Sequence, residues 1–354
     1  MFRELRNQQI KERVIMMKNY GLHTLILLIT IFAQLDSNKG PHSKTYQNKK
    51  KATLLQKKPT PQCSPPPQKI YTTADLITHV TPLENKRFVF IAPGYNNANW
   101  VERMLLSIFT QNYSNYHIIC IDDASTDDSV LKIKTCISAY KKQDKITLIE
   151  NKERQGMMAN RYNAIYMCND NDICIILDGD DWLFPDPEIL NFYNQVYSDQ
   201  NIWLTFGQFV EYPSGKIGYG REYSFNTIRK NAYRKEFFGA QHLRTFYAWL
   251  FKLVHIESFI HKGSFIRFCT DHAILYPMLE MAGFHAVFLS KITCVYNRCN
   301  PLSGCKKSTN DGNDCSAWVK AQTPYQPLTN KPEIPLKINN YKKIASDGFI
   351  GVNG

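Results

Sequence analysis

The chain has 354 residues, of which 44% are apolar and 13% aromatic, so it can bury a sizeable core and wholesale disorder is excluded. At roughly 150 residues per domain, this length fits about two domains, or one large α/β domain with appendages. The formal net charge is +12, but the first 70 residues hold 13 of the 43 basic residues and only 3 of the 31 acidic ones. The basic balance therefore belongs to an N-terminal arm and does not indicate a nucleic-acid partner.

The N-terminal arm places basic residues before an apolar stretch from Leu22 to Leu35. A positive flank and about 14 mostly apolar residues are typical of a secretory signal, whereas a membrane span needs about 20. We expect residues 1–36 to be a signal peptide or short signal anchor, and the protein to be exported or membrane-associated; if this segment is not functional, the protein would be cytoplasmic. Residues 37–85 are basic and rich in Pro and Lys, which predicts an extended tether.

From residue 86 the hydrophobic period switches repeatedly between strand and helix. Short apolar runs predict four strands, over 88–92, 117–121, 146–149 and 173–177. Helical spacing predicts three intervening helices, over 100–109, from the region of Ser125 to Tyr140, and about 158–167. This alternation predicts an α/β fold with a Rossmann-like, mostly parallel sheet flanked by helices.

We expect one catalytic-type domain over 86–304, with a nucleotide-binding half (86–186) and a C-terminal acceptor-side half (187–304). Beyond residue 305 the sequence is polar, and we expect a tail without a domain of its own over 305–354.

The ten cysteines do not form a dense scaffold. Three of them lie in or beside apolar runs and are expected in the core: Cys120, Cys168 and Cys174. Four others gather near the end of the chain: Cys294, Cys299, Cys305 and Cys315. Their spacings lack the two-residue gap of common zinc modules, so disulfides in an export compartment are favoured over a zinc site, which stays an alternative.

Unusual polar residues follow three of the predicted strands. Pro93-Gly94-Tyr95-Asn96-Asn97 follows the first strand, Asp122-Asp123 the second, and Asp178-Gly179-Asp180-Asp181 the fourth. Ligands of parallel sheets bind at the carboxyl edge of the strands. We therefore expect these residues to converge on one rim. After the second strand end, Ser125 or Thr126 is expected to cap the following helix with its hydroxyl.

The aspartates after the fourth strand predict a divalent cation. Asp178, Asp180 and Asp181 repel one another, and they are enclosed by Ile175–Leu177 before and Trp182 after. A hard ion such as Mn²⁺ or Mg²⁺ takes oxygen ligands and also binds phosphate oxygens. The alternative is a solvated acidic turn. Because the chain has neither a Walker-type loop nor a dinucleotide glycine fingerprint, phosphate recognition would fall to the cation together with Arg or Lys.

Asp271 is the candidate general base. It opens a long apolar helix in the segment Phe268-Cys269-Thr270-Asp271-His272. The alternative is a carboxylate that only stabilises the positive end of the helix dipole.

Four segments in order now resemble a known family: P-G-Y-N-N, I-D-D-A-S-T-D-D-S, the N-x-x-R-x-G…N-R-Y-N segment, and I-L-D-G-D-D-W-L-F-P-D. Over about 86–300 the chain resembles the family 2 glycosyltransferases of GT-A fold. The resemblance implies that Asp178 and Asp180 form a metal-binding D-x-D that grips the sugar-nucleotide diphosphate, and that Asp271 is the catalytic base. The nucleotide-binding residues that it implies are Pro93, Tyr95, Asn97, Asp123, Arg161 and Asp178.

The acceptor side is less marked in the sequence. Aromatic residues stack on sugar faces, and polar residues between the two halves are placed to line an acceptor site. On these grounds we expect acceptor contacts from Asp181, Trp182 and His242.

These features together predict an inverting, metal-dependent glycosyltransferase of hexosyltransferase type, with a UDP-linked sugar donor and a hydroxyl acceptor on a glycan, lipid or protein. One alternative is a sugar-phosphate nucleotidyltransferase, against which stands the absence of Lys or Arg between Gly94 and Arg103. A second alternative is a non-catalytic protein that binds sugar nucleotides.

Overall fold

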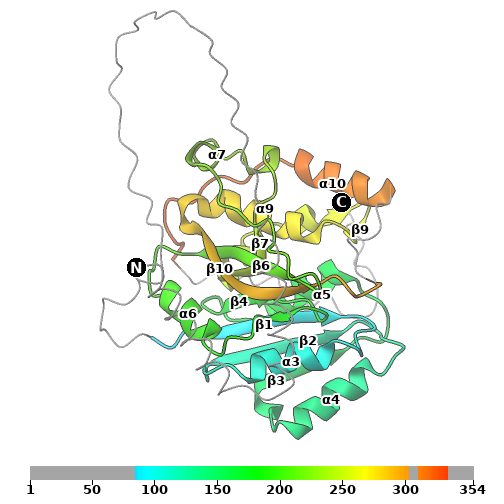
Figure 1. Ribbon diagram of the computed structural model, residues 1–354. Coiled ribbons are helices and arrows are strands. Elements are labelled where there is room, and N and C mark those ends of the chain that lie inside the picture. The colour runs from blue at the N-terminus through cyan, green and yellow to red at the C-terminus, as the bar shows by residue number, and fades with distance from the viewer. Residues whose placement is uncertain (1–83, 303–309, 334–354) are drawn as a thin grey trace, which may run out of the picture. The chain divides into compact units, whose positions relative to one another are not determined.

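In the computed structural model, described for residues 84–302 and 310–333, an eight-stranded sheet is the central element (Figure 1). Its strand order is β3-β2-β1-β4-β7-β6-β10-β5. The strands are β1 (Phe88–Gly94), β2 (Tyr116–Asp122), β3 (Ile146–Glu150), β4 (Ile173–Ile176), β5 (Trp182–Leu183), β6 (Leu204–Tyr212), β7 (Gln241–Tyr247) and β10 (Ala286–Asn297). A separate short hairpin is formed by β8 (Ile260–His261) and β9 (Ser264–Phe265).

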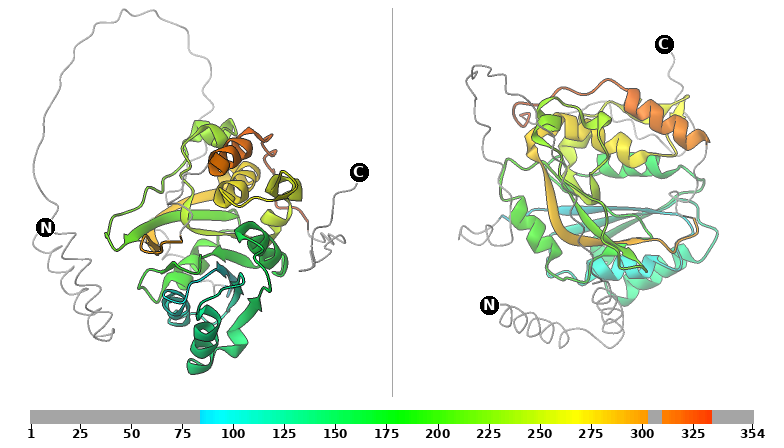
Figure 2. Two further views of the ribbon diagram at one scale, coloured as in Figure 1. Left: turned by 90° about the vertical axis from the view of Figure 1, so that its right-hand side faces the viewer. Right: turned by 45° about the horizontal axis from the view of Figure 1, so that its top comes forward.

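Helices cover both faces of this sheet. They are α3 (Val101–Phe109), α4 (Ser129–Ala139), α5 (Met157–Tyr166), α6 (Ile189–Val196), α7 (Phe225–Arg229), α8 (Ala248–Lys252), α9 (Thr270–Ala282) and α10 (Asn310–Ala321). Single 3-10 turns are η1 (Gln143–Lys145), η2 (Tyr233–Lys235), η3 (Ile256–Phe259) and η4 (Gly283–His285). Helices α3 and α4 lie on one side of the sheet, and α9 and α10 lie on the other (Figures 1 and 2).

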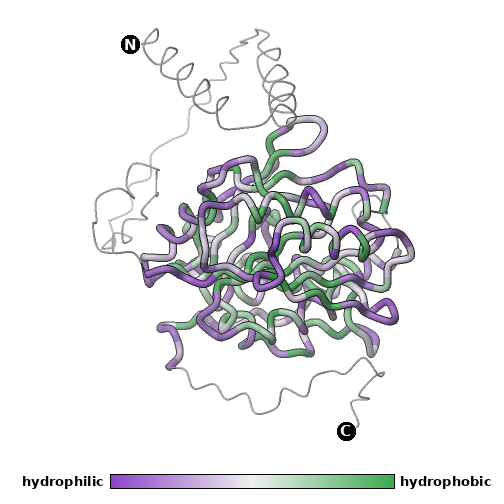
Figure 3. The backbone as a smooth tube through the Cα atoms, turned by 90° about the horizontal axis from the view of Figure 1, so that it is seen from below, coloured by the Kyte–Doolittle hydropathy of each residue, from purple (hydrophilic) through white to green (hydrophobic). Residues whose placement is uncertain are grey.

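The first half of the sheet confirms the predicted fold. Strands β3, β2, β1 and β4 all run parallel to one another. The first six residues of β1 are buried, as expected of a strand covered on both faces. In Figure 3 the outer turns are mostly hydrophilic, while hydrophobic segments run through the interior.

The second half of the sheet reverses direction. Strand β7 pairs antiparallel with both β4 and β6, β10 runs parallel to β6, and β5 closes the edge antiparallel to β10. All seven residues of β7 are buried, including the polar Gln241, His242 and Arg244. The sheet is therefore mostly parallel, and its antiparallel strand β7 carries polar side chains into the interior.

The start of α4 differs from the expectation. We expected Ser125 or Thr126 to cap this helix, but the helix begins at Ser129, and its N-cap residue Asp128 makes no side-chain cap bond. The Ser125 hydroxyl instead accepts a hydrogen bond from the backbone N–H of Asn96 at 2.8 Å. The predicted cap thus links the second strand end to the loop after β1.

The chain beyond residue 305 also differs from the polar tail that we expected. Helix α10 packs against α9, with Cys315 and Val319 of α10 buried. The following segment is attached as well, since the Tyr325 backbone N–H donates to Glu280 Oε2 at 3.0 Å. Polar composition misled the prediction because few apolar side chains suffice to dock a short helix.

The cysteine predictions have a mixed outcome. Cys120, Cys168 and Cys174 are buried, which confirms their place in the core. In the late cluster, Cys294, Cys299 and Cys315 are free thiols, and Cys305 lies outside the described residues. The expected disulfides are therefore not formed between the described members of this cluster.

The N-terminal predictions, a signal or anchor over 1–36 and a tether over 37–85, lie outside the described residues apart from the last two positions. Within the ranges that the structure does describe, every helix is too short or too polar to cross a bilayer.

Candidate active site

The ends of β1, β2 and β4 meet at one rim. The Asp123 N–H donates to Gly94 O at 2.8 Å, and the Gly179 N–H donates to Pro93 O at 3.1 Å. Residue 179 must be glycine at this close approach, because a Cβ there would lie 2.4 Å from Asn97 Nδ2 and 3.2 Å from Pro93 O. The predicted convergence of these strand ends is thus present in the backbone.

Asp123 is held as a buried carboxylate. It accepts hydrogen bonds from the backbone N–H groups of Gln155 (2.8 Å) and Gly156 (3.0 Å) and from the side chains of Asn151 and Arg154. Burial by itself would raise the pKa of Asp123, but the hydrogen bonds that it accepts lower the pKa below its ordinary value. Asp123 is therefore an ionised acceptor at neutral pH.

Arg154 connects Asp123 with Tyr95. Its Nε donates to Asp123 Oδ2 at 3.0 Å, and its guanidinium lies 3.6 Å from the centre of the Tyr95 ring. The Arg154 side chain is 53% exposed, so it forms an outer wall that can move. Arg154 is the arginine of the N-x-x-R-x-G segment that carries the family resemblance, but its stacking on Tyr95 is visible only in the structure.

Arg161 bridges the aspartate turn and the start of α9. Its Nη2 donates to Asp178 Oδ1 at 2.5 Å, and its Nη1 donates to Asp271 Oδ1 at 2.8 Å and to the Thr270 hydroxyl at 3.0 Å. The residue is only 1% exposed, yet burial does not neutralise it, since the two carboxylates hold the pKa of Arg161 above its ordinary value. One guanidinium therefore brings Asp178 and Asp271 to the same site.

Asp271 has a second cationic partner, which sequence analysis missed. Arg244 Nη1 of β7 lies 3.1 Å from Asp271 Oδ2, and Arg244 Nε donates to Ala240 O. Burial would raise the pKa of Asp271, but Arg244 and Arg161 hold it well below its usual range. The Asp271 side chain is still 32% exposed, so an ionised carboxylate faces the site.

Asp178 and Asp180 fit a divalent cation. Burial and the neighbouring charge of Asp178 raise the pKa of Asp180 to about 6, while Asn300 Nδ2 donates to Asp180 Oδ2 at 2.7 Å. Two crowded carboxylates at the end of a buried strand are the oxygen donor set that Mn²⁺ or Mg²⁺ takes, and a cation there would relieve their repulsion. Asn300 is a further member of the site that sequence analysis missed.

The three expected acceptor residues are enclosed. Asp181, Trp182 and His242 are 1%, 4% and 5% exposed. Trp182 packs edge-on against Tyr212, with Arg103 over its ring at 4.7 Å. Their acceptor role stays a prediction.

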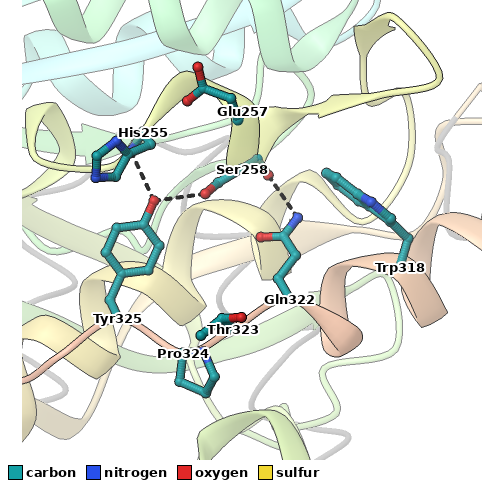
Figure 4. A pocket seen from close by; sticks show the side chains of 8 residues that line it. All are labelled: His255, Glu257, Ser258, Trp318, Gln322, Thr323, Pro324 and Tyr325. Atoms are coloured by element: carbon teal, nitrogen blue, oxygen red, sulfur yellow. Dashed lines mark hydrogen bonds between the residues drawn. The ribbon is translucent and has the colours of Figure 1, made fainter.

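A pocket of about 490 Å³ lies between η3 and the segment after α10 (Figure 4). Tyr325 forms one wall, and its hydroxyl accepts from the His255 backbone N–H at 2.9 Å and contacts the Ser258 hydroxyl at 2.7 Å. None of the residues predicted for the site lines this pocket.

Residues 89–259 match the family model of glycosyl transferase family 2. This part of the chain is a family 2 glycosyltransferase domain. Its mixed sheet and flanking helices are the GT-A fold, and the chain aligns with the crystal structure of S. aureus TarS 1–349 in complex with UDP-GlcNAc at a TM-score of 0.50. That likeness has 13% sequence identity and covers 66% of this chain and 65% of the TarS chain.

Two curated relatives of the family 2 domain also match over only part of their length. Glycosyltransferase GlyA of Streptococcus pneumoniae is 30% identical over 144 residues, which are 41% of this chain and 18% of GlyA. The putative glycosyltransferase EpsE of Bacillus subtilis is 33% identical over 91 residues, which are 26% of this chain and 32% of EpsE. The match thus spans less than a third of each of these two relatives.

Proposed function

We propose that the protein is an inverting, metal-dependent glycosyltransferase that moves a sugar from a nucleotide-sugar donor to a hydroxyl acceptor. The observation that carries this proposal is the contact of Arg161 with both Asp178 and Asp271. It joins a candidate diphosphate-binding turn to a candidate base, and each carboxylate keeps part of its surface exposed, 21% for Asp178 and 32% for Asp271.

The nucleoside of the donor would bind beside β1 and β2. Asp123 is an ionised hydrogen-bond acceptor for ribose hydroxyls, and Tyr95 offers a ring face for the base. Pro93 and Asn97 shape the floor of this half, where Pro93 O binds the Gly179 N–H. Arg154 now covers Tyr95 and would swing aside or stack on the base.

The donor diphosphate would bind at Asp178 and Asp180. A divalent cation held there supplies Lewis-acid stabilisation of the negative charge that develops on the departing nucleoside diphosphate. Arg161 Nη2 lies against Asp178, so its charge adds to the cationic side of the site. The anomeric carbon would then lie between this turn and Asp271.

Asp271 would act as the general base. Its carboxylate takes the proton of the acceptor hydroxyl while the acceptor oxygen bonds to the anomeric carbon, and the bond from that carbon to the diphosphate oxygen breaks on the opposite face. This displacement inverts the anomeric configuration. Arg161 and Arg244 fix both carboxylate oxygens, which keeps the base ionised and oriented.

The experiment is release of nucleoside diphosphate and transfer to pooled acceptors, measured by mass spectrometry, with UDP-GlcNAc as the first donor because the fold neighbour TarS was solved with it. Asp271→Asn should lower the rate by about 10²–10⁴. The matched control is Asp144→Asn, an aspartate with a 73% exposed side chain in η1, which should keep full activity. Pyrophosphate release from a nucleoside triphosphate would favour nucleotidyl transfer instead. Donor binding without turnover would favour a binding protein.

The metal is tested separately at Asp180. Calorimetry should show Mn²⁺-dependent UDP binding that is lost in Asp180→Asn, and the transfer rate should fall by about 10²–10³. UDP binding that is equally strong with and without Mn²⁺ would remove the metal from the proposal.

The acceptor and the cellular location remain part of the proposal. We propose a glycan, lipid or protein acceptor, and export or membrane association through the N-terminal segment. Fractionation of cells that express the full chain, compared with a variant lacking residues 1–36, tests the location.

A further inference from the structure

A second group of ligand-type side chains lies in the interior, behind the aspartate turn. Asp181 ends that turn, His242 is on β7, and Cys294 is on β10. One potential ligand atom from each lies within 4.8 Å of the other two. All three residues are enclosed, with exposures of 1%, 5% and 0%.

Two side-chain atoms of this group, one on Asp181 and one on His242, have no hydrogen-bond partner within the part of the chain that the structure describes. They are Asp181 Oδ2 and His242 Nδ1. The other carboxylate oxygen of Asp181 accepts from the Asn297 backbone N–H at 2.8 Å, which holds this side chain in place. Each buried polar atom left unpaired costs about 1–3 kcal/mol, so two on residues of one cluster call for an explanation.

The donor types identify a ligand that would satisfy them. A carboxylate oxygen, an imidazole nitrogen and a thiolate sulfur together form a set that binds Zn²⁺ in a tetrahedral arrangement. At zinc–ligand distances of about 2.0–2.3 Å, tetrahedral ligands lie roughly 3.3–3.8 Å apart. The present separations require only small side-chain movements to reach this range.

The same three donor types argue against Mn²⁺ or Mg²⁺, the cations proposed for Asp178 and Asp180, as the ion bound here. Mn²⁺ and Mg²⁺ prefer oxygen ligands, which Asp178 and Asp180 supply, whereas sulfur and nitrogen select softer ions. Charge balance agrees, because one carboxylate and one thiolate neutralise a divalent ion that is removed from water. The nearby Arg244 is already paired with Asp271.

We propose that Asp181, His242 and Cys294 bind a structural zinc ion, with water in the fourth position. The ion would fasten the aspartate turn to β7 and β10, three segments that are distant in sequence. Because His242 and Arg244 are neighbours on β7, the same ion would hold the strand that presents Arg244 to Asp271. The site is thus separate from the donor's cation and supports both ends of the active site.

The first test is the zinc content of the full chain, purified without an affinity tag that binds metal and measured by mass spectrometry. We expect about one zinc per chain in the wild type and at least a fivefold loss in Cys294→Ala. The matched control is Cys120→Ala, another free, buried cysteine, which lies on β2 and should retain its zinc. Zinc below about one fifth per chain in the wild type, or full retention in Cys294→Ala, would overturn the proposal.

A second test, Co²⁺ binding, remains informative if the Cys294→Ala variant fails to fold. Co²⁺ added to the metal-stripped wild type should produce a thiolate-to-cobalt charge-transfer band in the near ultraviolet and be displaced by Zn²⁺. His242→Gln keeps the thiol and should weaken Co²⁺ binding at least tenfold, while the band position shows that sulfur remains a ligand. No thiolate band in the wild type would reject the site. Neither measurement depends on transfer activity, so both stand even if the proposed function fails.

Discussion

Two buried arginines, Arg161 and Arg234, both form ion pairs with carboxylates, but the two ion pairs serve different purposes. Arg234 in η2 donates to both carboxylate oxygens of Glu280 on α9, and Nη1 contacts Val319 O. Its side chain is 5% exposed, and that of Glu280 is 0% exposed. Arg161 is as deeply buried, at 2%, but its partners Asp178 and Asp271 are 21% and 32% exposed.

The difference lies in what removal of the arginine leaves behind. Without Arg234, Glu280 is a charge sealed in the interior, and such a charge is strongly destabilising. Without Arg161, both aspartates can still be hydrated, because part of each side chain is exposed to solvent. An ion pair in which both the arginine and the carboxylate are buried therefore supports the fold. A buried arginine whose two carboxylate partners are partly exposed is available for binding and catalysis.

The largest expected effect is on stability. Arg234→Met should lower the free energy of unfolding by about 3–5 kcal/mol, because it leaves the buried charge of Glu280 without its cationic partner. Urea unfolding followed by circular dichroism measures the loss. Arg234→Met combined with Glu280→Leu should recover most of it, and an unstable double variant would mean that the loss comes from packing of the arginine stem instead.

Arg161→Met should act mainly on activity. We expect the transfer rate to fall by about 10²–10³, with a loss of unfolding free energy that is clearly smaller than that of Arg234→Met. The two variants are compared at one temperature at which both are folded. Equal losses of stability would break the distinction between the two pairs.

Asp123→Asn tests a third buried charge and has a defined pH dependence. Its pKa is lowered on folding, so the stabilisation is fully present above the ordinary value of 3.8 and is lost as the pH falls through the lower folded-state value. We expect a loss of about 1–3 kcal/mol at neutral pH. The difference in unfolding free energy between wild type and variant should be constant in neutral and mildly acidic buffer. It should narrow only when the pH falls below the ordinary aspartate pKa of 3.8. A gap that changes around neutral pH would contradict this.

The smallest effect concerns Arg244. Removing it in Arg244→Met should raise the pKa of Asp271 toward its ordinary value, so kcat/KM of the variant should fall below that of the wild type only in acidic buffer. The base is active when ionised, so the variant loses activity first at the acidic end. A uniform fall at every pH would make Arg244 a packing residue only.

The first half of the domain, residues 86–186, could be predicted because its pattern is local. Apolar runs such as Phe88–Ala92 are long enough to identify a strand covered on both faces, and polar residues directly after them mark the rim. The residue pattern and the family resemblance supplied Asp178, Asp180 and Asp271, and the structure brings Asp178 and Asp271 together through Arg161.

The acceptor half could not be predicted in the same way. Strand β7 carries Gln, His, Arg and Thr at buried positions, and a half-buried strand is normally recognised by alternating polar residues. Arg244 and Asn300 reach the site through tertiary contacts with Asp271 and Asp180, and no spacing in the sequence records these contacts. The helix α10 was missed for the same reason.

The tight fit at Gly179 couples the loop after β1 to the aspartate turn. Asn97 fills the space that a side chain at 179 would occupy, so the loop after β1 and the turn between Asp178 and Asp180 interlock. A nucleoside that shifted Tyr95 and Asn97 on arrival would thereby shift the diphosphate end as well. Under the proposed function, this contact would link nucleoside binding to the position of the aspartate turn.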